Sequence, residues 1–181
     1  MIIADMHTHS SFSTDSTESM MKMAKAAAEK GLRTICLTEH LDYDYPGGEF
    51  QLDTAEYHDE LMRVKAELSD RVEVLFGVEL GLMDYLAPRL NEFAAAWDLD
   101  FIIGSSHLVD GKDPYYPEYF EELGSKNGIL SYFESILANV RAFDNFDVYG
   151  HLDYVVRYSP EKRYEPLDYR EIIDELLKAL V

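Results

Sequence analysis

The chain begins "MIIADMHTHSSFSTDS", which places Asp5, His7 and His9 at every second position directly after an apolar start. Residues two apart on a β-strand leave the same face, so the imidazoles of His7 and His9 would lie side by side. Asp5 would point the same way, one step deeper, where it could orient a ligand. Two histidines held on a rigid strand form half of a metal site.

A histidine or glutamate also ends each of the later apolar segments. The segment "TICLTEH" ends with His40, "VEVLFGVE" with Glu79, "DFIIGSSH" with His107 and "DVYGH" with His151. The carboxyl ends of parallel strands in a curved sheet meet, so we expect these side chains to converge. A single histidine after an apolar segment is usually a core or capping residue, but recurrence at successive strand ends favours metal ligation. Only His58 of the six histidines lies outside this pattern, and we expect it on a solvated helix face.

Nitrogen and carboxylate ligands without thiolates suit Zn²⁺, Fe²⁺ or Mn²⁺. The donors exceed the four of one tetrahedral site, so we expect two to three divalent ions, with a carboxylate such as Glu79 able to bridge two of them. Asp15, in "SFSTDS", is a further oxygen donor, or alternatively an acid at a helix N-terminus. Cys36, in "TICLT", is expected to be a small buried core residue without a function.

Strand-like and helix-like segments alternate along the whole chain, with no linker or low-complexity stretch between them. The strand candidates are "MIIADMHTH", "RTICLTEH", "VEVLFGVEL", "DFIIGSSHL" and "FDVYGHLDY", and the helix candidates span about 19–31, 54–69, 84–96, 128–143 and 168–180. Candidate capping residues are Asp53 and either Ser125 or Ser131. Two long connections, Tyr43 to Gln51 and Asp110 to Lys126, follow strands, and loops of this kind face the active site in an α/β barrel.

Composition limits the class of protein. The 181 residues are 47% hydrophobic, which predicts one domain over residues 1–181 with a sizeable core. A formal charge of −19, from 35 acids against 16 bases, argues against binding of nucleic acid along its phosphate backbone. No apolar run approaches the roughly 20 residues of a membrane span, and the start lacks a signal-like segment. We therefore expect a cytoplasmic protein that binds neither nucleic acid nor membrane.

The segments "DMHTHS", "LTEH", "GVE", "SSH" and "GHLD", in this order, resemble the successive motifs of the PHP (polymerase and histidinol phosphatase) family across the whole chain. Within it, "SSHLVDGKDPYYPEYF" and "GHLDYVVRY" most resemble the histidinol-phosphate phosphatases of histidine biosynthesis. The resemblance implies a distorted TIM-like (β/α)7 barrel with a trinuclear metal centre that hydrolyses phosphate esters.

The resemblance also implies roles for individual residues. One ion would be held by His7, His9 and Glu79, a second by Glu79, His107 and His151, and a third by Asp15 with His40. The nucleophile would be a metal-bound hydroxide near Glu79.

Three residues are candidates for binding the substrate. Arg157, in "VVRY", matches the position that binds the substrate phosphate, and its bidentate fork favours it over Lys112. Asp113 could meet a cationic amino or imidazole end of the substrate, or could be a plain turn residue.

The resemblance is incomplete at the C-terminal end. The family pattern closes with a strand motif of the type Gly-Ser-Asp-Ala-His that this sequence lacks, and only five βα units are visible where seven strands are implied. An open barrel exposes its first and fifth strands as edges, so we expect a homo-oligomer formed by edge pairing or by exchange of elements.

The leading hypothesis is a metal-dependent phosphomonoesterase that hydrolyses L-histidinol phosphate. One alternative keeps the phosphoesterase chemistry but takes nucleotides or a nucleic acid 3′ end. Another is a metal-binding relative or fragment with impaired turnover. Amide or ring hydrolysis is a weaker alternative, because such sites usually add a carboxylated lysine and no lysine here ends a strand.

Overall fold

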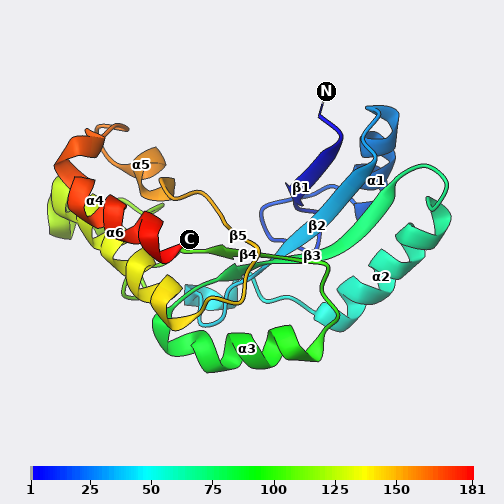
Figure 1. The fold of residues 1–181 in the computed structure, drawn as a ribbon, viewed down its shortest axis with the longest axis horizontal. Coiled ribbons are helices and arrows are strands. Elements are labelled where there is room, and N and C mark those ends of the chain that lie inside the picture. The colour runs from blue at the N-terminus through cyan, green and yellow to red at the C-terminus, as the bar shows by residue number, and fades with distance from the viewer. Residues whose placement is uncertain (1) are drawn as a thin grey trace.

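A computed structural model describes residues 2–181, which form one curled, fully parallel sheet with the strand order β1-β2-β3-β4-β5 (Figure 1). The strands are β1 (Ala4–Thr8), β2 (Thr34–Leu41), β3 (Glu73–Gly81), β4 (Phe101–Ser105) and β5 (Val148–Tyr149). This open half-barrel confirms the expected α/β class and the expected incomplete TIM-like architecture.

Most helices lie around the outside of the curled sheet, whereas α5 lies at the rim of its concave side (Figure 1). They are α1 (Met20–Glu29), α2 (Thr54–Glu67), α3 (Ala87–Ala96), α4 (Glu118–Ala142), α5 (Tyr154–Tyr158) and α6 (Arg170–Ala179), with short 3₁₀ turns at Pro46–Gly48, Asp84–Leu86 and Pro166–Tyr169. Helices α4 and α6 pack against each other beside β5, whereas α1 and α2 pack beside β2 and β3. Each helix among the described residues is too short or too polar to cross a lipid bilayer.

Most of the expected elements are confirmed, and two expectations are wrong in extent. Helix α4 is broken at Gly124, where φ is 70° and ψ is 159°, so the expected helix at about 128–143 corresponds to its longer second segment and the helical segment from Glu118 was not expected. Ser125 directly follows the break, whereas Ser131 lies inside the second segment and cannot cap it. The fifth strand is only Val148–Tyr149, because the chain turns at Gly150 into α5. The cap at Asp53 is confirmed, since its Oδ1 accepts a hydrogen bond of 3.0 Å from the Glu56 backbone.

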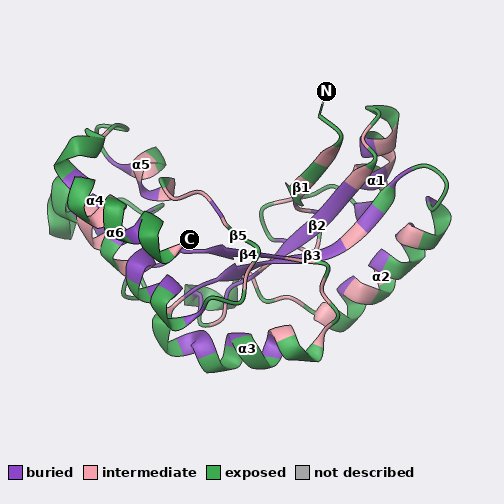
Figure 2. Cartoon of the chain, in the orientation of Figure 1, coloured by how far each residue is buried: buried purple, intermediate pink, exposed green. Residues whose placement is uncertain are grey.

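The sheet is buried under the helices along most of β2 and β3 (Figure 2). The Tyr57 side chain on α2 is fully buried, and its hydroxyl lies 2.7 Å from the Leu37 carbonyl and 2.9 Å from the Gly77 carbonyl. Cys36 is also fully buried, and burial raises the pKa of its thiol to about 12. The thiol therefore stays protonated at neutral pH, which agrees with the expected role of Cys36 as a small buried core residue.

Candidate metal centre

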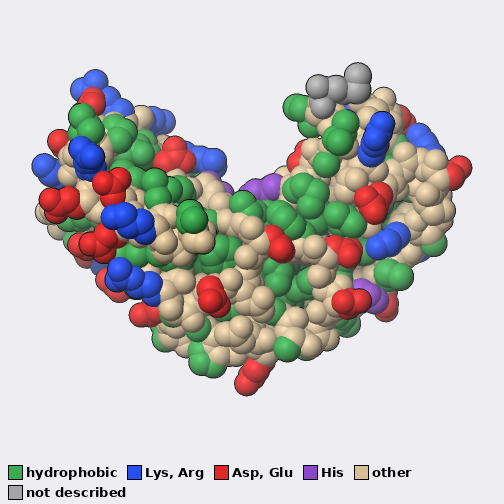
Figure 3. Space-filling view, viewed as in Figure 1, with side chains coloured by type: hydrophobic (Ala, Val, Ile, Leu, Met, Phe, Trp, Pro, Cys, Tyr) green, Lys and Arg blue, Asp and Glu red, His purple; other side chains and the backbone are tan. Residues whose placement is uncertain are grey.

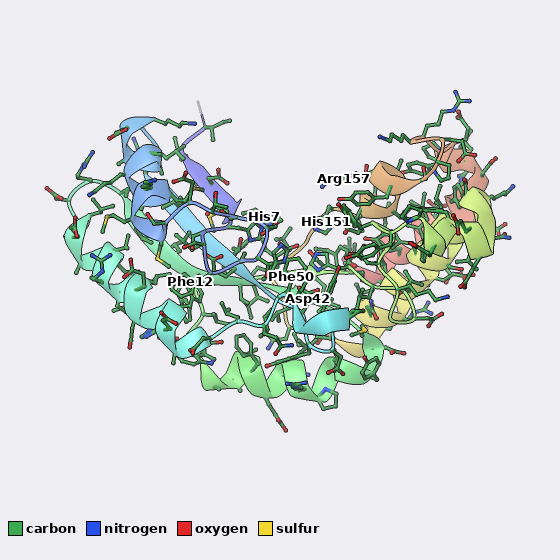
Figure 4. The ribbon with its side chains drawn as sticks, turned by 180° about the vertical axis from the view of Figure 1, so that it is seen from behind. His7, Phe12, Asp42, Phe50, His151 and Arg157 are labelled. Atoms are coloured by element: carbon green, nitrogen blue, oxygen red, sulfur yellow. The ribbon has the colours of Figure 1, made fainter. Side chains whose placement is uncertain are left out.

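The concave side of the sheet forms a hollow with histidine side chains on its floor (Figure 3). The hollow contains a cavity of about 600 Å³. All seven residues predicted as metal ligands line it: His7, His9, Asp15, His40, Glu79, His107 and His151. His7 and His151, which come from opposite ends of the sheet, both lie at this hollow (Figure 4).

Glu79, at the middle of the cluster, is fully buried and faces four imidazoles within 3.3 Å and a fifth, that of His40, whose Nδ1 lies 3.6 Å from Oε2. Its Oε2 lies 2.7 Å from His7 Nε2 and 3.3 Å from His9 Nε2. Its Oε1 lies 3.0 Å from His151 Nε2 and 3.3 Å from His107 Nε2. Each carboxylate oxygen thus belongs to a separate pair of histidines, which is the arrangement a bridging carboxylate needs.

Four groups of donor atoms among the described residues are compact enough to hold an ion, with all ligand atoms of a group within 4.8 Å of one another. They are His7, His9 and Glu79; Glu79, His107 and His151; His9, Asp15 and His40; and His40, Asp42 and His107. The first two match the sets that the family resemblance implied, and the third adds His9 to the expected pair. Buried His40 Nδ1 and His151 Nδ1 also lack a hydrogen-bond partner among the described residues. This donor chemistry fits divalent ions that accept nitrogen and oxygen ligands.

The charges of the cluster are coupled. Burial alone would raise the pKa of Glu79, but hydrogen bonds from the histidines outweigh it and hold that pKa well below the usual range. Burial alone would lower the pKa of His9 and of His107, but Glu79 outweighs it for His9 and Asp42 for His107, so both pKa values are raised. A hydrogen bond from His40 lowers the pKa of Asp15. Without ions, the raised pKa values of His9 and His107 therefore favour their protonated forms beside the buried carboxylates.

Arg157 and Asp113 line the cavity, and Lys112 does not. Arg157 lies on α5 with an exposed side chain. Asp113 is buried and accepts hydrogen bonds from the Tyr45 hydroxyl at 2.6 Å and the Tyr154 hydroxyl at 3.0 Å. Lys112 forms an ion pair with a surface glutamate instead, so the structure does not bring it to the site.

The expected place of Asp5 beside the ligands is not found. The pairing of β1 with β2 shifts register between Asp5 and Thr8, which breaks the strict alternation on which the expectation relied. Asp5 is exposed, and its carboxylate accepts a hydrogen bond of 3.4 Å from the backbone of His7 rather than from a ring.

The chain matches the PHP domain family over residues 5–181. It belongs to the PHP family.

Two curated relatives are similar to this PHP chain over nearly its whole length. It is 36% identical to the histidinol-phosphatase of Lactococcus lactis subsp. lactis (strain IL1403), with 97% of this chain and 66% of that protein covered. It is 32% identical to the probable histidinol-phosphatase of Clostridium acetobutylicum, with 99% of this chain and 69% of that protein covered. The PHP chain thus spans about two thirds of the length of these relatives.

Solved structures agree on the fold. A crystal structure of histidinol phosphate phosphatase from Lactococcus lactis, complexed with zinc, L-histidinol and phosphate, superposes with a TM-score of 0.92 at 35% identity, covering 98% of this chain and 68% of that one. A putative histidinol phosphatase from Listeria monocytogenes has a TM-score of 0.80 at 17% identity and shares the PHP fold, with 98% of this chain and 78% of that one covered.

Two buried acids at the PHP centre were not anticipated from the sequence. Glu39 accepts hydrogen bonds from the hydroxyls of Ser10 and Ser13, both at 2.6 Å, and so fixes the loop after His9 to β2. Asp42 lies 2.6 Å from a ring nitrogen of His107. Asp42 follows His40 by two positions, so alternation along an extended strand end was a signal that could have found it.

Proposed function

We propose that this chain is a metal-dependent phosphomonoesterase that hydrolyses L-histidinol phosphate to L-histidinol and phosphate. The observation that carries the proposal is the buried Glu79 shared by four histidines, in a chain 36% identical to a histidinol-phosphatase. A solved structure similar to this one contains zinc, L-histidinol and phosphate, which supports the same substrate here.

The centre would hold two to three divalent ions, of zinc, iron or manganese. His7 and His9 would hold one together with Glu79, His107 and His151 would hold a second on the other Glu79 oxygen, and Asp15 with His40 would contribute to a third. When bound, such ions neutralise the phosphate dianion and lower the pKa of a water nucleophile.

The side chains around the cavity would bind and orient the ester. The Arg157 guanidinium, which lines the cavity, would donate two parallel hydrogen bonds to phosphate oxygens. Asp113 would receive the cationic end of the substrate, held in place by the Tyr45 and Tyr154 hydroxyls that donate to it. A carboxylate with two fixed tyrosine donors keeps its orientation when a ligand arrives.

We also propose that residues 1–181 act as one cytoplasmic domain that associates with a second copy through the sheet edges. Ile2 and Ile3, beside β1, are 80% and 49% exposed, and Val148 on β5 is 44% exposed. Apolar residues on unpaired strands favour edge pairing. Light scattering after size exclusion is expected to give twice the monomer mass, and a monomer at micromolar concentration would contradict this association.

The central experiment measures release of inorganic phosphate from L-histidinol phosphate by protein loaded separately with zinc, iron(II) or manganese. At least one metal is expected to support turnover, chelation to abolish it, and His107→Ala to lower both metal content and turnover. Full metal loading with no phosphate release would overturn the proposed function in favour of a metal-binding relative without turnover.

A further inference from the structure

The Asp42 side chain lies between two histidines of the candidate metal centre that come from different strands. Its Oδ1 is 2.6 Å from His107 Nδ1, and its Oδ2 is 3.7 Å from His40 Nδ1. The residue is 3% exposed, and both Asp42 Oδ2 and His40 Nδ1 are buried without a hydrogen-bond partner among the described residues. Because a carboxylate oxygen accepts, the 2.6 Å contact favours the proton on Nδ1 of His107, whereas 3.7 Å is too long for a hydrogen bond to His40.

The opposite nitrogen of His107 faces a candidate ion position, since His107 Nε2 is 3.3 Å from Glu79 Oε1. A proton fixed on Nδ1 leaves Nε2 with its lone pair, which is the form that binds a metal. The Asp42 carboxylate therefore sets the tautomer and the ring orientation of His107. It does not do so for His40, whose Nδ1 lies 3.6 Å from Glu79 Oε2 and 3.7 Å from Asp42 Oδ2.

The backbone and one glycine make this position possible. The Asp42 N–H donates to the Phe50 carbonyl at 3.1 Å, which anchors the chain just after β2. Strands β2 and β3 pair Leu41 with Leu80, so Asp42 stands beside Gly81 at the end of β3. A Cβ at Gly81 would collide with the Asp42 carboxylate. The carboxylate can cross the end of β3 to reach His107 because position 81 has no side chain.

We propose that Asp42 is a positioning residue that orients His107 toward the bound ions, and that Gly81 provides the space it occupies. This inference rests on the proposed metal-dependent function and deepens it. Loss of a partner that orients a ligand typically costs about 10- to 100-fold in metal affinity. The same range is expected for Asp42→Asn and Asp42→Ala, since the neutral amide is a weaker acceptor for the His107 N–H and the methyl group accepts nothing.

The test measures the rate at which zinc-loaded protein loses zinc to an excess of chelator. Asp42→Asn, Asp42→Ala and Gly81→Ala are each expected to speed the loss at least 10-fold. The matched control is Gly104→Ala on β4, where an added Cβ would meet Leu82 and Phe146 but not the carboxylate. It is expected to leave the rate within twofold of the parent. Circular dichroism of each variant confirms that it is folded.

Two further readouts separate positioning from a general loss of structure. Gly81→Ala combined with Asp42→Ala is expected to be no worse than Asp42→Ala alone, because the collision disappears with the carboxylate. The visible absorption of cobalt-loaded protein, which reports ligand geometry, is expected to change in Asp42→Asn and to stay unchanged in Gly104→Ala.

Zinc loss from folded Asp42→Ala within twofold of the parent would overturn the positioning role, and so would a parent chain that holds no zinc. A parent chain that retains zinc but releases no phosphate would contradict the proposed phosphatase, while the zinc-loss comparison would still decide the role of Asp42.

Discussion

Glu79 Oε1 lies 3.0 Å from His151 Nε2, although the two residues are 72 positions apart. The other oxygen of the same carboxylate reaches back to His7 on β1, 72 positions in the opposite direction. The candidate centre therefore connects the two ends of the sheet through one side chain on its middle strand.

Glu79→Gln removes the charge that both pairs of histidines face. Metal content per chain is expected to fall below one ion, and turnover by about 100-fold or more, because the amide is a poor ligand and cannot bridge. Elemental analysis after dialysis measures the first effect. Glu60→Gln on the outer face of α2 is the matched control, and equal metal content in the two variants would contradict the bridging role.

Arg157→Lys keeps the positive charge and removes the planar fork. The KM for L-histidinol phosphate is expected to rise about 10-fold with unchanged metal content, since a lysine cannot duplicate bidentate contacts to phosphate. Arg163→Lys, at an exposed position outside the residues that line the cavity, is the control. A KM equal to that of the parent would exclude Arg157 from phosphate binding.

Asp113→Asn is expected to discriminate between substrates. The kcat/KM for L-histidinol phosphate should fall about 10-fold, as for loss of one charged hydrogen bond, because the cationic end of the substrate loses its counter-charge. The kcat/KM for 4-nitrophenyl phosphate, which has no cation, should change less than twofold. Equal losses for both esters would mean that Asp113 serves the structure of the cavity rather than recognition of the substrate.

The metal-free chain is expected to be less stable at pH 8.5 than at pH 6. The pKa of His107 is raised in the folded chain, so its protonation stabilises the fold fully below about pH 6.5, its unfolded value, and this contribution is lost as pH rises through the folded pKa. The pKa of His9 is also raised in the folded chain, so its protonation likewise contributes stability that is lost as pH rises. Urea unfolding at the two pH values measures the effect, and a midpoint that is higher at pH 8.5 would contradict it.

Acid also destabilises the metal-free chain, and it acts through Glu79. Its pKa is lowered in the folded chain, so its contribution is present above about pH 4.5 and is lost as pH falls further. The unfolding midpoint of the metal-free chain should therefore also drop between pH 5 and pH 3. A flat profile over that range would contradict the buried ion pairs at Glu79.

Tyr57→Phe tests the core beneath the site. The substitution leaves the Leu37 and Gly77 carbonyls without the buried hydroxyl between them, which should cost about 1–3 kcal/mol of unfolding free energy. Urea denaturation measures it, with Tyr85→Phe at a 62% exposed position as the control. Equal stability of the two variants would show that water or a backbone shift replaces the hydroxyl.

The strand ends were the part of the site that the sequence could predict. A ligand such as His40 or Glu79 directly follows an apolar run, and parallel pairing places those ends together whatever lies between them. The register of β2 with β3 pairs His40 with Glu79 directly, so alternation on each strand was enough to put both side chains on the concave face.

Residues outside the regular alternation could not be placed in the same way. Asp5 was misplaced because β1 shifts register against β2, and no local pattern announces that irregularity. The start of α4 was missed because the segment before Gly124 looks like a Gly- and Tyr-rich loop, yet Tyr119 and Phe120 are buried against the rest of α4. Tertiary packing, rather than local helix propensity, therefore makes this segment helical.

Among residues 2–181, strand β1 pairs with β2 alone, yet it carries His7 and is directly followed by His9, both of which face Glu79. An edge strand held from one side opens more readily than the interior of a sheet. An ion shared between this strand and Glu79 would tie the edge to the middle of the sheet, so opening of β1 would have to break that tie first. Backbone amide hydrogen exchange in Ala4–Thr8 should therefore depend on metal concentration much more steeply than exchange in β3. The exchange rate of the N-terminal strand would then report whether ions occupy the centre.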